Sequence, residues 1–173
     1  MRILGIDPGL RCTGYGCLDV TGPNISLVEA GIFRVAAQQP LSLRLAQLHA
    51  DLDATMIELS PDLLVVETLY SHYSRARTAI LMGHARGVIL LAAGTRSIEV
   101  IDYTATEVKK AVTGHGHAEK LQVQEAVMHQ LALQERPEPF DVSDAIAIAL
   151  CASRRVDSTP PRTISTTAIS EAS

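Results

Sequence analysis

The spacing of hydrophobic residues changes several times along the chain, and each change marks a different kind of predicted element. Short apolar runs bounded by turn residues predict strands over 2–9, 13–20, 25–35, 62–67 and 98–102. The first three strands are joined by short linkers, which is typical of antiparallel neighbours. The fourth, DLLVVE, is apolar almost throughout, as expected of a strand that is covered on both faces.

Apolar residues spaced three or four apart predict helices among the later strands. The clearest is 41–59, where apolar residues recur along one stripe and Pro61 follows the end. The polar segment 68–77 is expected to form a loop that runs into a long helix ending near Ala93. Further helices are expected over 104–112, 118–132 and 141–155. This order predicts an α/β fold, with a mixed five-stranded sheet flanked by helices.

The chain has 173 residues, which suits one domain with a sizeable core. We expect this single domain to span residues 1–156. Residues 157–173 are rich in serine and threonine and carry no apolar stripe, so we expect a disordered tail there.

The composition narrows the class of function. A net charge of −4 argues against a protein that coats nucleic acid through bulk charge, although it allows a local basic face. Aromatic residues make up 3%, too few for a platform that stacks many bases. No apolar run approaches the ~20 residues of a membrane span, and the first residues do not have a signal-peptide pattern. Three cysteines without a CxxC pair indicate reduced thiols in a cytoplasmic protein.

The first strand ends in a carboxylate that the next residues hold in place. Pro8 restricts Asp7 to extended geometry, and Gly9 leaves room for another backbone or a ligand. Such a carboxylate at the tip of a strand suits metal or phosphate chemistry, whereas a simple turn is the alternative.

Three further acids are expected near Asp7. Glu67 ends the fourth strand, which this topology places beside the first. Asp141 and Asp144 share one face at the start of the last helix, where capping the helix is an alternative role. Four converging carboxylates repel one another, and a pair of divalent cations would offset that cost. Oxygen ligands favour Mg²⁺ or Mn²⁺, and two such ions suit the attack of water on a phosphodiester.

Six short motifs, in order along the chain, closely resemble one protein family. They are GIDPG at 5–9, TGYG at 13–16, VVE at 65–67, GHARGV at 83–88, VKKAVTGHGHAEKLQV at 108–123 and DVSDAIAIA at 141–149. Together they are similar to RuvC, the bacterial Holliday-junction resolvases, from Met1 to about Ser153. The resemblance implies a ribonuclease-H-like fold, a homodimer and Mg²⁺-dependent, symmetric nicking of four-way DNA junctions. It also implies cooperation with the RuvA–RuvB branch-migration complex.

The resemblance implies site residues as well. The family's acids fall on Asp7, Glu67, Asp141 and Asp144, without indicating which one serves as the base. The expected DNA-binding residues are Tyr70, Arg75, Arg77, Lys109, Lys110 and Lys120. For the basic residues, a solvated charged face is the alternative.

Several features depart from the family pattern or have two interpretations. Tyr70 stands where the family commonly has phenylalanine, and the segment after Glu67 is about one residue longer, which leaves the register of Arg75 open. Arg86 fits a structural hydrogen-bonding role as well as a DNA contact. Gly83 and Gly87 lie on one helix face, where either the sheet or a second subunit can pack closely.

Three other functions fit parts of the pattern. One is a non-catalytic junction-binding protein, in which the acids only cap and fold. Another is a YqgF-type nuclease of the same fold that acts on RNA. The third is an actin- or hexokinase-like phosphate-binding domain, for which the chain is too short to form two lobes.

Overall fold

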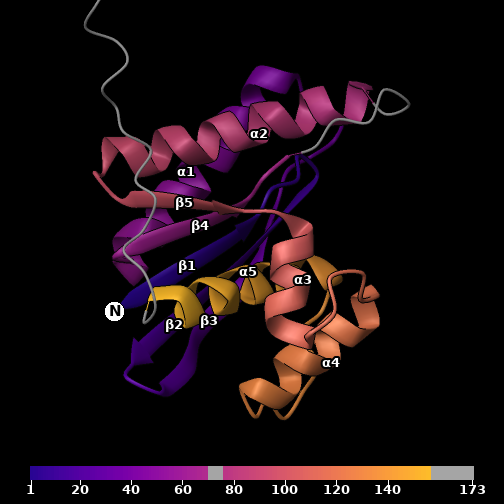
Figure 1. The fold of residues 1–173 in the computed structure, drawn as a ribbon. Coiled ribbons are helices and arrows are strands. Elements are labelled where there is room, and N and C mark those ends of the chain that lie inside the picture. Colours follow the sequence, from indigo (N-terminus) through magenta and orange to yellow (C-terminus); the bar gives the residue numbers. More distant parts are fainter. Residues whose placement is uncertain (70–75, 157–173) are drawn as a thin grey trace, which may run out of the picture.

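The computed structural model describes residues 1–69 and 76–156, which form five strands and five helices (Figure 1). Two expected DNA contacts, Tyr70 and Arg75, lie outside the described residues. The expected disordered tail, 157–173, lies outside them as well.

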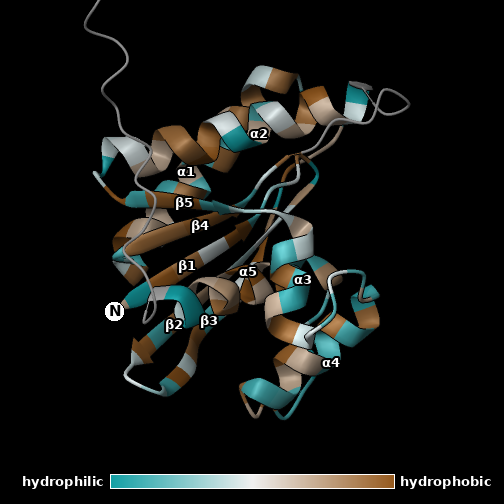
Figure 2. Cartoon of the chain, viewed as in Figure 1, coloured by the Kyte–Doolittle hydropathy of each residue, from teal (hydrophilic) through white to brown (hydrophobic). Residues whose placement is uncertain are grey.

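The strands form one mixed sheet in the order β3-β2-β1-β4-β5. Its strands are β1 (Arg2–Asp7), β2 (Cys12–Thr21), β3 (Asn24–Arg34), β4 (Leu63–Glu67) and β5 (Glu99–Tyr103). β1, β2 and β3 pair antiparallel, whereas β4 runs parallel to β1 and β5 runs parallel to β4. The predicted mixed five-stranded sheet is therefore confirmed. Its middle strands, β1 and β4, are coloured hydrophobic over most of their length in Figure 2.

Helices cover both faces of this sheet (Figure 1). They are α1 (Leu41–Leu59), α2 (Ala76–Thr95), α3 (Ala105–Thr113), α4 (Lys120–Gln130) and α5 (Phe140–Val156). α1 and α2 pack on one face, and α5, backed by α3 and α4, packs on the other. α4 is shorter than the predicted 118–132, because Glu119 and Gln122 form a capping box at its start and Leu131 follows its last turn.

The approach of α5 to the sheet depends on small residues in β1 and β2. A methyl group added at Gly14 would collide with the carbonyl oxygen of Asp141, and one at Gly5 would collide with that of Ala145. At Gly16 an added Cβ would lie 2.6 Å from Cγ1 of Ile146. The helix therefore lies directly on the sheet, and its first turn is placed over the start of β2.

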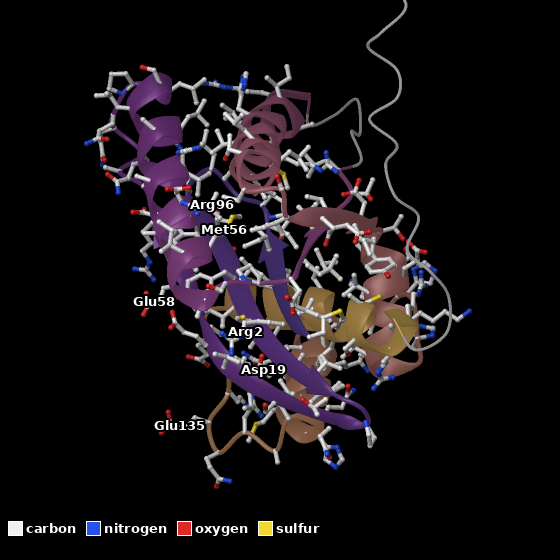
Figure 3. The ribbon with its side chains drawn as sticks, turned by 90° about the vertical axis from the view of Figure 1, so that its left-hand side faces the viewer. Arg2, Asp19, Met56, Glu58, Arg96 and Glu135 are labelled. Atoms are coloured by element: carbon white, nitrogen blue, oxygen red, sulfur yellow. The ribbon has the colours of Figure 1, made fainter. Side chains whose placement is uncertain are left out.

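Ion pairs tie elements together at the opposite edge of the sheet from this turn. The Nε atom of Arg2 lies 2.8 Å from a carboxylate oxygen of Asp19, and these neighbours on β1 and β2 are labelled in Figure 3. Arg96, also labelled there, pairs at 2.6 Å with Asp53 of α1. Arg2 and Arg96 are thus both paired with carboxylates.

Helix α2 is apolar on two sides. Its inner residues Ala85, Ile89 and Ala93 are fully buried against the sheet. On its outer side Ile80 is 62% and Leu91 is 58% exposed, although both are large apolar residues. The stretch Arg77–Thr95 is also long and apolar enough to cross a membrane by length and composition, contrary to the sequence expectation. The burial of its inner side is typical of a core helix. That role does not explain the exposed apolar residues on its outer side.

Candidate active site

Four carboxylates gather where the central parallel strands end. Asp7 is the last residue of β1 and Glu67 is the last residue of β4, and these strands pair in register up to Ile6 and Val66. Asp141 and Asp144 lie in the first turn of α5, which the close contact at Gly14 places over the same edge. The strand ends and this turn therefore bring together the acids that the sequence analysis selected.

The pKa values of two of these acids show how strongly the site disfavours negative charge. Burial, followed by the charges of Asp144, Glu67 and Asp141, raises the pKa of Asp7 from 3.8 to about 7. Burial and the charge of Asp144 also raise the pKa of Glu67. Because the acids destabilise one another's ionised forms, this edge of the sheet favours positive charge.

One lysine, which the sequence indicated only as a DNA-binding residue, already supplies positive charge there. Nζ of Lys120, at the start of α4, donates a hydrogen bond to Asp144 at 3.0 Å. Its charge also lowers the pKa of Asp7 and Glu67. The Lys120 side chain is 62% exposed, so solvent screens this pair and it offsets only part of the repulsion.

The donor set fits a hard divalent cation. It consists of carboxylate oxygens, which Mg²⁺ and Mn²⁺ prefer, and the pKa of Asp7 shows that their charge is incompletely balanced. Among the described residues, no three histidine, cysteine, aspartate or glutamate side chains are already arranged to hold a metal ion. A cation at this site would therefore have to draw the carboxylates closer together.

The predicted DNA-binding residues in the described part surround the carboxylates unevenly. Lys109 of α3 is close enough for its charge to lower the pKa of Glu67. Lys110 is exposed in the same helix, and Arg77 is exposed in the first turn of α2. No contact with the acids is seen for these last two.

Cys12, at the start of β2, also lies in the site, although the sequence analysis assigned it no role there. Burial is the main cause of the raised pKa of its thiol, and the charge of Asp141 raises this pKa further. The sequence signal was its position after the DPG turn. That turn is fixed by the hydroxyl of Thr13, which donates to the carbonyl oxygen of Gly9.

Arg86 and the histidine pair between α3 and α4 have no assigned role in the carboxylate site. Arg86 pairs with Asp102 of β5 at 2.6 Å, which confirms the structural interpretation of this arginine. The rings of His115 and His117 lie edge to face at 5.9 Å between α3 and α4, with no third metal-binding side chain within the described residues.

Comparisons with known proteins agree with this architecture. The family model for crossover junction endodeoxyribonuclease RuvC matches residues 3–152. The RuvC of Rhodopirellula baltica is 51% identical over 149 residues, which cover 86% of this chain and 84% of that protein. The Thermus thermophilus RuvC structure superposes with a TM-score of 0.82 at 32% identity, covering 93% of this chain and 99% of that one. A second T. thermophilus structure, RuvC in complex with a Holliday junction substrate, gives a TM-score of 0.85 at 27% identity, covering 95% and 100%. The chain belongs to the RuvC family of crossover junction endodeoxyribonucleases.

Proposed function

We propose that this protein is an endonuclease that resolves four-way DNA junctions by paired, symmetric nicks during recombination and repair. The observation that carries the proposal is the carboxylate cluster at the ends of β1 and β4, in which the pKa of Asp7 is raised to about 7. It stands in a chain of the RuvC family, one member of which is described in complex with a Holliday junction substrate. A cytoplasmic location and cooperation with RuvA–RuvB fit this role.

Asp7, Glu67, Asp141 and Asp144 would hold Mg²⁺, with two ions per site and Mn²⁺ as an expected substitute. The chemistry that such ions would supply is activation of a water molecule and neutralisation of the charge that develops on the phosphate. The protein's own part is to hold four carboxylates on rigid elements, two strand ends and one helix turn. Because Asp7 is largely withdrawn from water, its interaction with any cation is weakly screened.

The basic residues beside the acids would position the DNA. Lys109 and Lys120 act on the carboxylates through charge, so a phosphate between them and the acids would meet positive charge on one side. We assign Lys110, Arg77 and Arg75 to the surrounding backbone contacts, and Tyr70 to stacking on junction bases.

A substrate panel tests this function against its alternatives. The protein is incubated with a four-way DNA junction, a linear duplex of the same sequence and a structured RNA, each with Mg²⁺ or with EDTA. We expect cleavage of the junction alone, and only with Mg²⁺. Cleavage confined to RNA would favour the YqgF-type function, and junction binding without cleavage in any metal would favour a non-catalytic binding protein.

We also propose that the protein is a homodimer. Paired cuts on a two-fold symmetric junction need two active sites related by a two-fold axis. The outer side of α2 offers the surface, because Ile80 and Leu91 are exposed there and Gly83 and Gly87 have open space around them. A second copy would remove this apolar surface from water.

Placing a charge on this surface is expected to separate the subunits. In the Ile80→Glu variant, dimerisation would bury an unpaired carboxylate, so we expect sedimentation at micromolar concentration to give a dimer for the parent and a monomer for the variant. Val28→Glu is the matched control, because Val28 is 40% exposed on β3 at the other side of the sheet. A dimer that survives Ile80→Glu, or a monomeric parent, would contradict the assignment of this surface.

A further inference from the structure

The cationic side chains differ in whether they are paired with carboxylates. Ion pairs in the described part of the chain engage Arg2, Arg86, Arg96, Lys120, Arg136 and Arg155. Arg11 and Arg34 have no such partner among residues 1–69 and 76–156, and both are exposed. Lys109, Lys110 and Arg77 also lack a carboxylate partner within the described residues. These three are already assigned to DNA binding, whereas Arg11 and Arg34 are not.

Arg34 lies on the same side of the sheet as the first turn of α5. It is the last residue of β3 and pairs in register with Cys12, so the two side chains point to the same face. Gly14, two residues after Cys12 on β2, faces Asp141, so this face is the one that carries α5. Arg34 therefore borders the carboxylate cluster without forming an ion pair with it.

Arg11 is held beside Arg34 through the backbone. The amide of Val35 donates to the carbonyl oxygen of Arg11 at 3.4 Å, which joins the turn after β1 to the end of β3. From the other face of the sheet, Nη2 of Arg44 donates to the carbonyl oxygen of Leu10 at 3.0 Å. These bonds fix the turn and leave the guanidinium group of Arg11 exposed to solvent.

The strand order places these arginines on the opposite side of the acids from the lysines. β3 lies two strands away from β1, which corresponds to about 10 Å from the strand that carries Asp7. α3, which carries Lys109, begins directly after the end of β5, which lies beyond β4 on the other side. A DNA strand that crosses the carboxylates would therefore meet positive charge before and after them.

We infer that Arg11 and Arg34 bind backbone phosphates of the junction DNA a few nucleotides from the scissile phosphate, on the side away from Lys109 and Lys120. The inference rests on the proposed function and extends its DNA-binding surface to the β2–β3 side. Guanidinium groups suit this role, because they bind phosphate oxygens in pairs and stay charged. Phosphates would supply the anionic partner that these two arginines lack within the described protein.

The salt dependence of junction binding, measured in EDTA so that no cleavage occurs, tests this inference. Each phosphate contact contributes about one to the slope of log affinity against log salt concentration. We therefore expect Arg11→Gln and Arg34→Gln each to reduce the slope by about one, and the double variant by about two. Arg34→Lys should keep most of the slope, because it keeps the charge. Arg136→Gln is the control, since it removes one charge from an arginine that is paired with Glu125.

Phosphate ethylation interference then locates the contacts. Ethylation of phosphates a few nucleotides to one side of the nick should interfere with binding of the parent protein. The double variant should lose the interference at those phosphates and keep it elsewhere. A slope and interference pattern unchanged in both single variants would overturn the inference, while cleavage of junctions by the parent would leave the proposed function standing. If the parent neither binds nor nicks a junction, both the inference and the proposed function fail. Melting temperatures show whether each variant is folded, and Arg34→Lys supplies a conservative form for the comparison.

Discussion

The Asp7→Asn variant is expected to bind four-way junctions as tightly as the parent and to nick them at least about a thousandfold more slowly. Asparagine has almost the same shape as aspartate but carries no charge, so the fold and the basic DNA-binding surface should be preserved. The lost charge would weaken the hold on the cations, whose contribution to phosphodiester hydrolysis is worth several kcal/mol. Such a contribution corresponds to a loss of roughly three orders of magnitude in rate.

Single-turnover nicking in Mg²⁺ measures this effect, and a binding titration in EDTA measures the affinity separately. Asp51→Asn is the matched control, because Asp51 lies on α1 and accepts a hydrogen bond only from its helix neighbour Gln47 among the contacts seen. It makes the same chemical change away from the strand ends and should nick at the parental rate. Undiminished Mg²⁺-dependent nicking by Asp7→Asn would show that this carboxylate is not part of the catalytic site.

The same substitution is expected to stabilise the metal-free protein at alkaline pH. The pKa of Asp7 is about 7 in the folded protein, above its ordinary value of 3.8 in an unfolded chain. The folded state therefore binds the proton more tightly, and the parent loses stability as the pH rises from about 4 to 7 and no further. Asparagine removes this loss, which is about 4 kcal/mol for a shift of this size. We expect the variant to melt roughly 8–16 °C above the parent at pH 8, and the difference to shrink toward pH 4.

Thermal melts in EDTA across this pH range provide the measurement, and added Mg²⁺ provides a second readout. A cation that binds only the folded state should raise the melting temperature of the parent at pH 8 more than that of Asp7→Asn. Asp51→Asn should follow the parent at every pH. A difference between parent and Asp7→Asn that does not change with pH would mean that burial and the neighbouring acids do not raise the pKa of Asp7.

Much of the fold follows from local sequence patterns. Leu63 to Val66 of β4 are buried on both faces of the sheet, as the continuous apolar run predicted. The two ends of α4 were less predictable, because Glu119 is a rare N-cap and the helix stops where Leu131 leaves the helical conformation. Such boundaries depend on a few side-chain hydrogen bonds that hydrophobic periodicity does not record.

The candidate site was predictable because three of its acids mark element boundaries. Asp7 and Glu67 end strands that the topology makes neighbours, and Asp141 opens the last helix. The partners of these acids were not predictable in the same way. Lys120 reaches Asp144 across 24 positions of sequence, and the charge of Asp141 acts on the thiol of Cys12 across a longer separation. Contacts of this kind exist only after the elements have packed.

The role of the outer side of α2 was also not predictable from the sequence alone. The stretch Arg77–Thr95 is apolar on both sides, so its composition alone does not separate a core helix from a membrane span or an interface. Burial in the structure distinguishes its two sides, because Ile89 is fully buried and Leu91 is 58% exposed. In the proposed homodimer, a second copy of the chain would cover the exposed side and would supply the second active site that paired cuts require.

The most direct test of the account is the position of the cuts on a mobile four-way junction. Each of the four strands is labelled in turn, and the products are mapped with Mg²⁺, with Mn²⁺ and with EDTA. We expect paired nicks at symmetric positions on two strands of like polarity, in either metal and not in EDTA. Tight binding without nicks in any metal would contradict this expectation and would leave the four acids with structural roles alone.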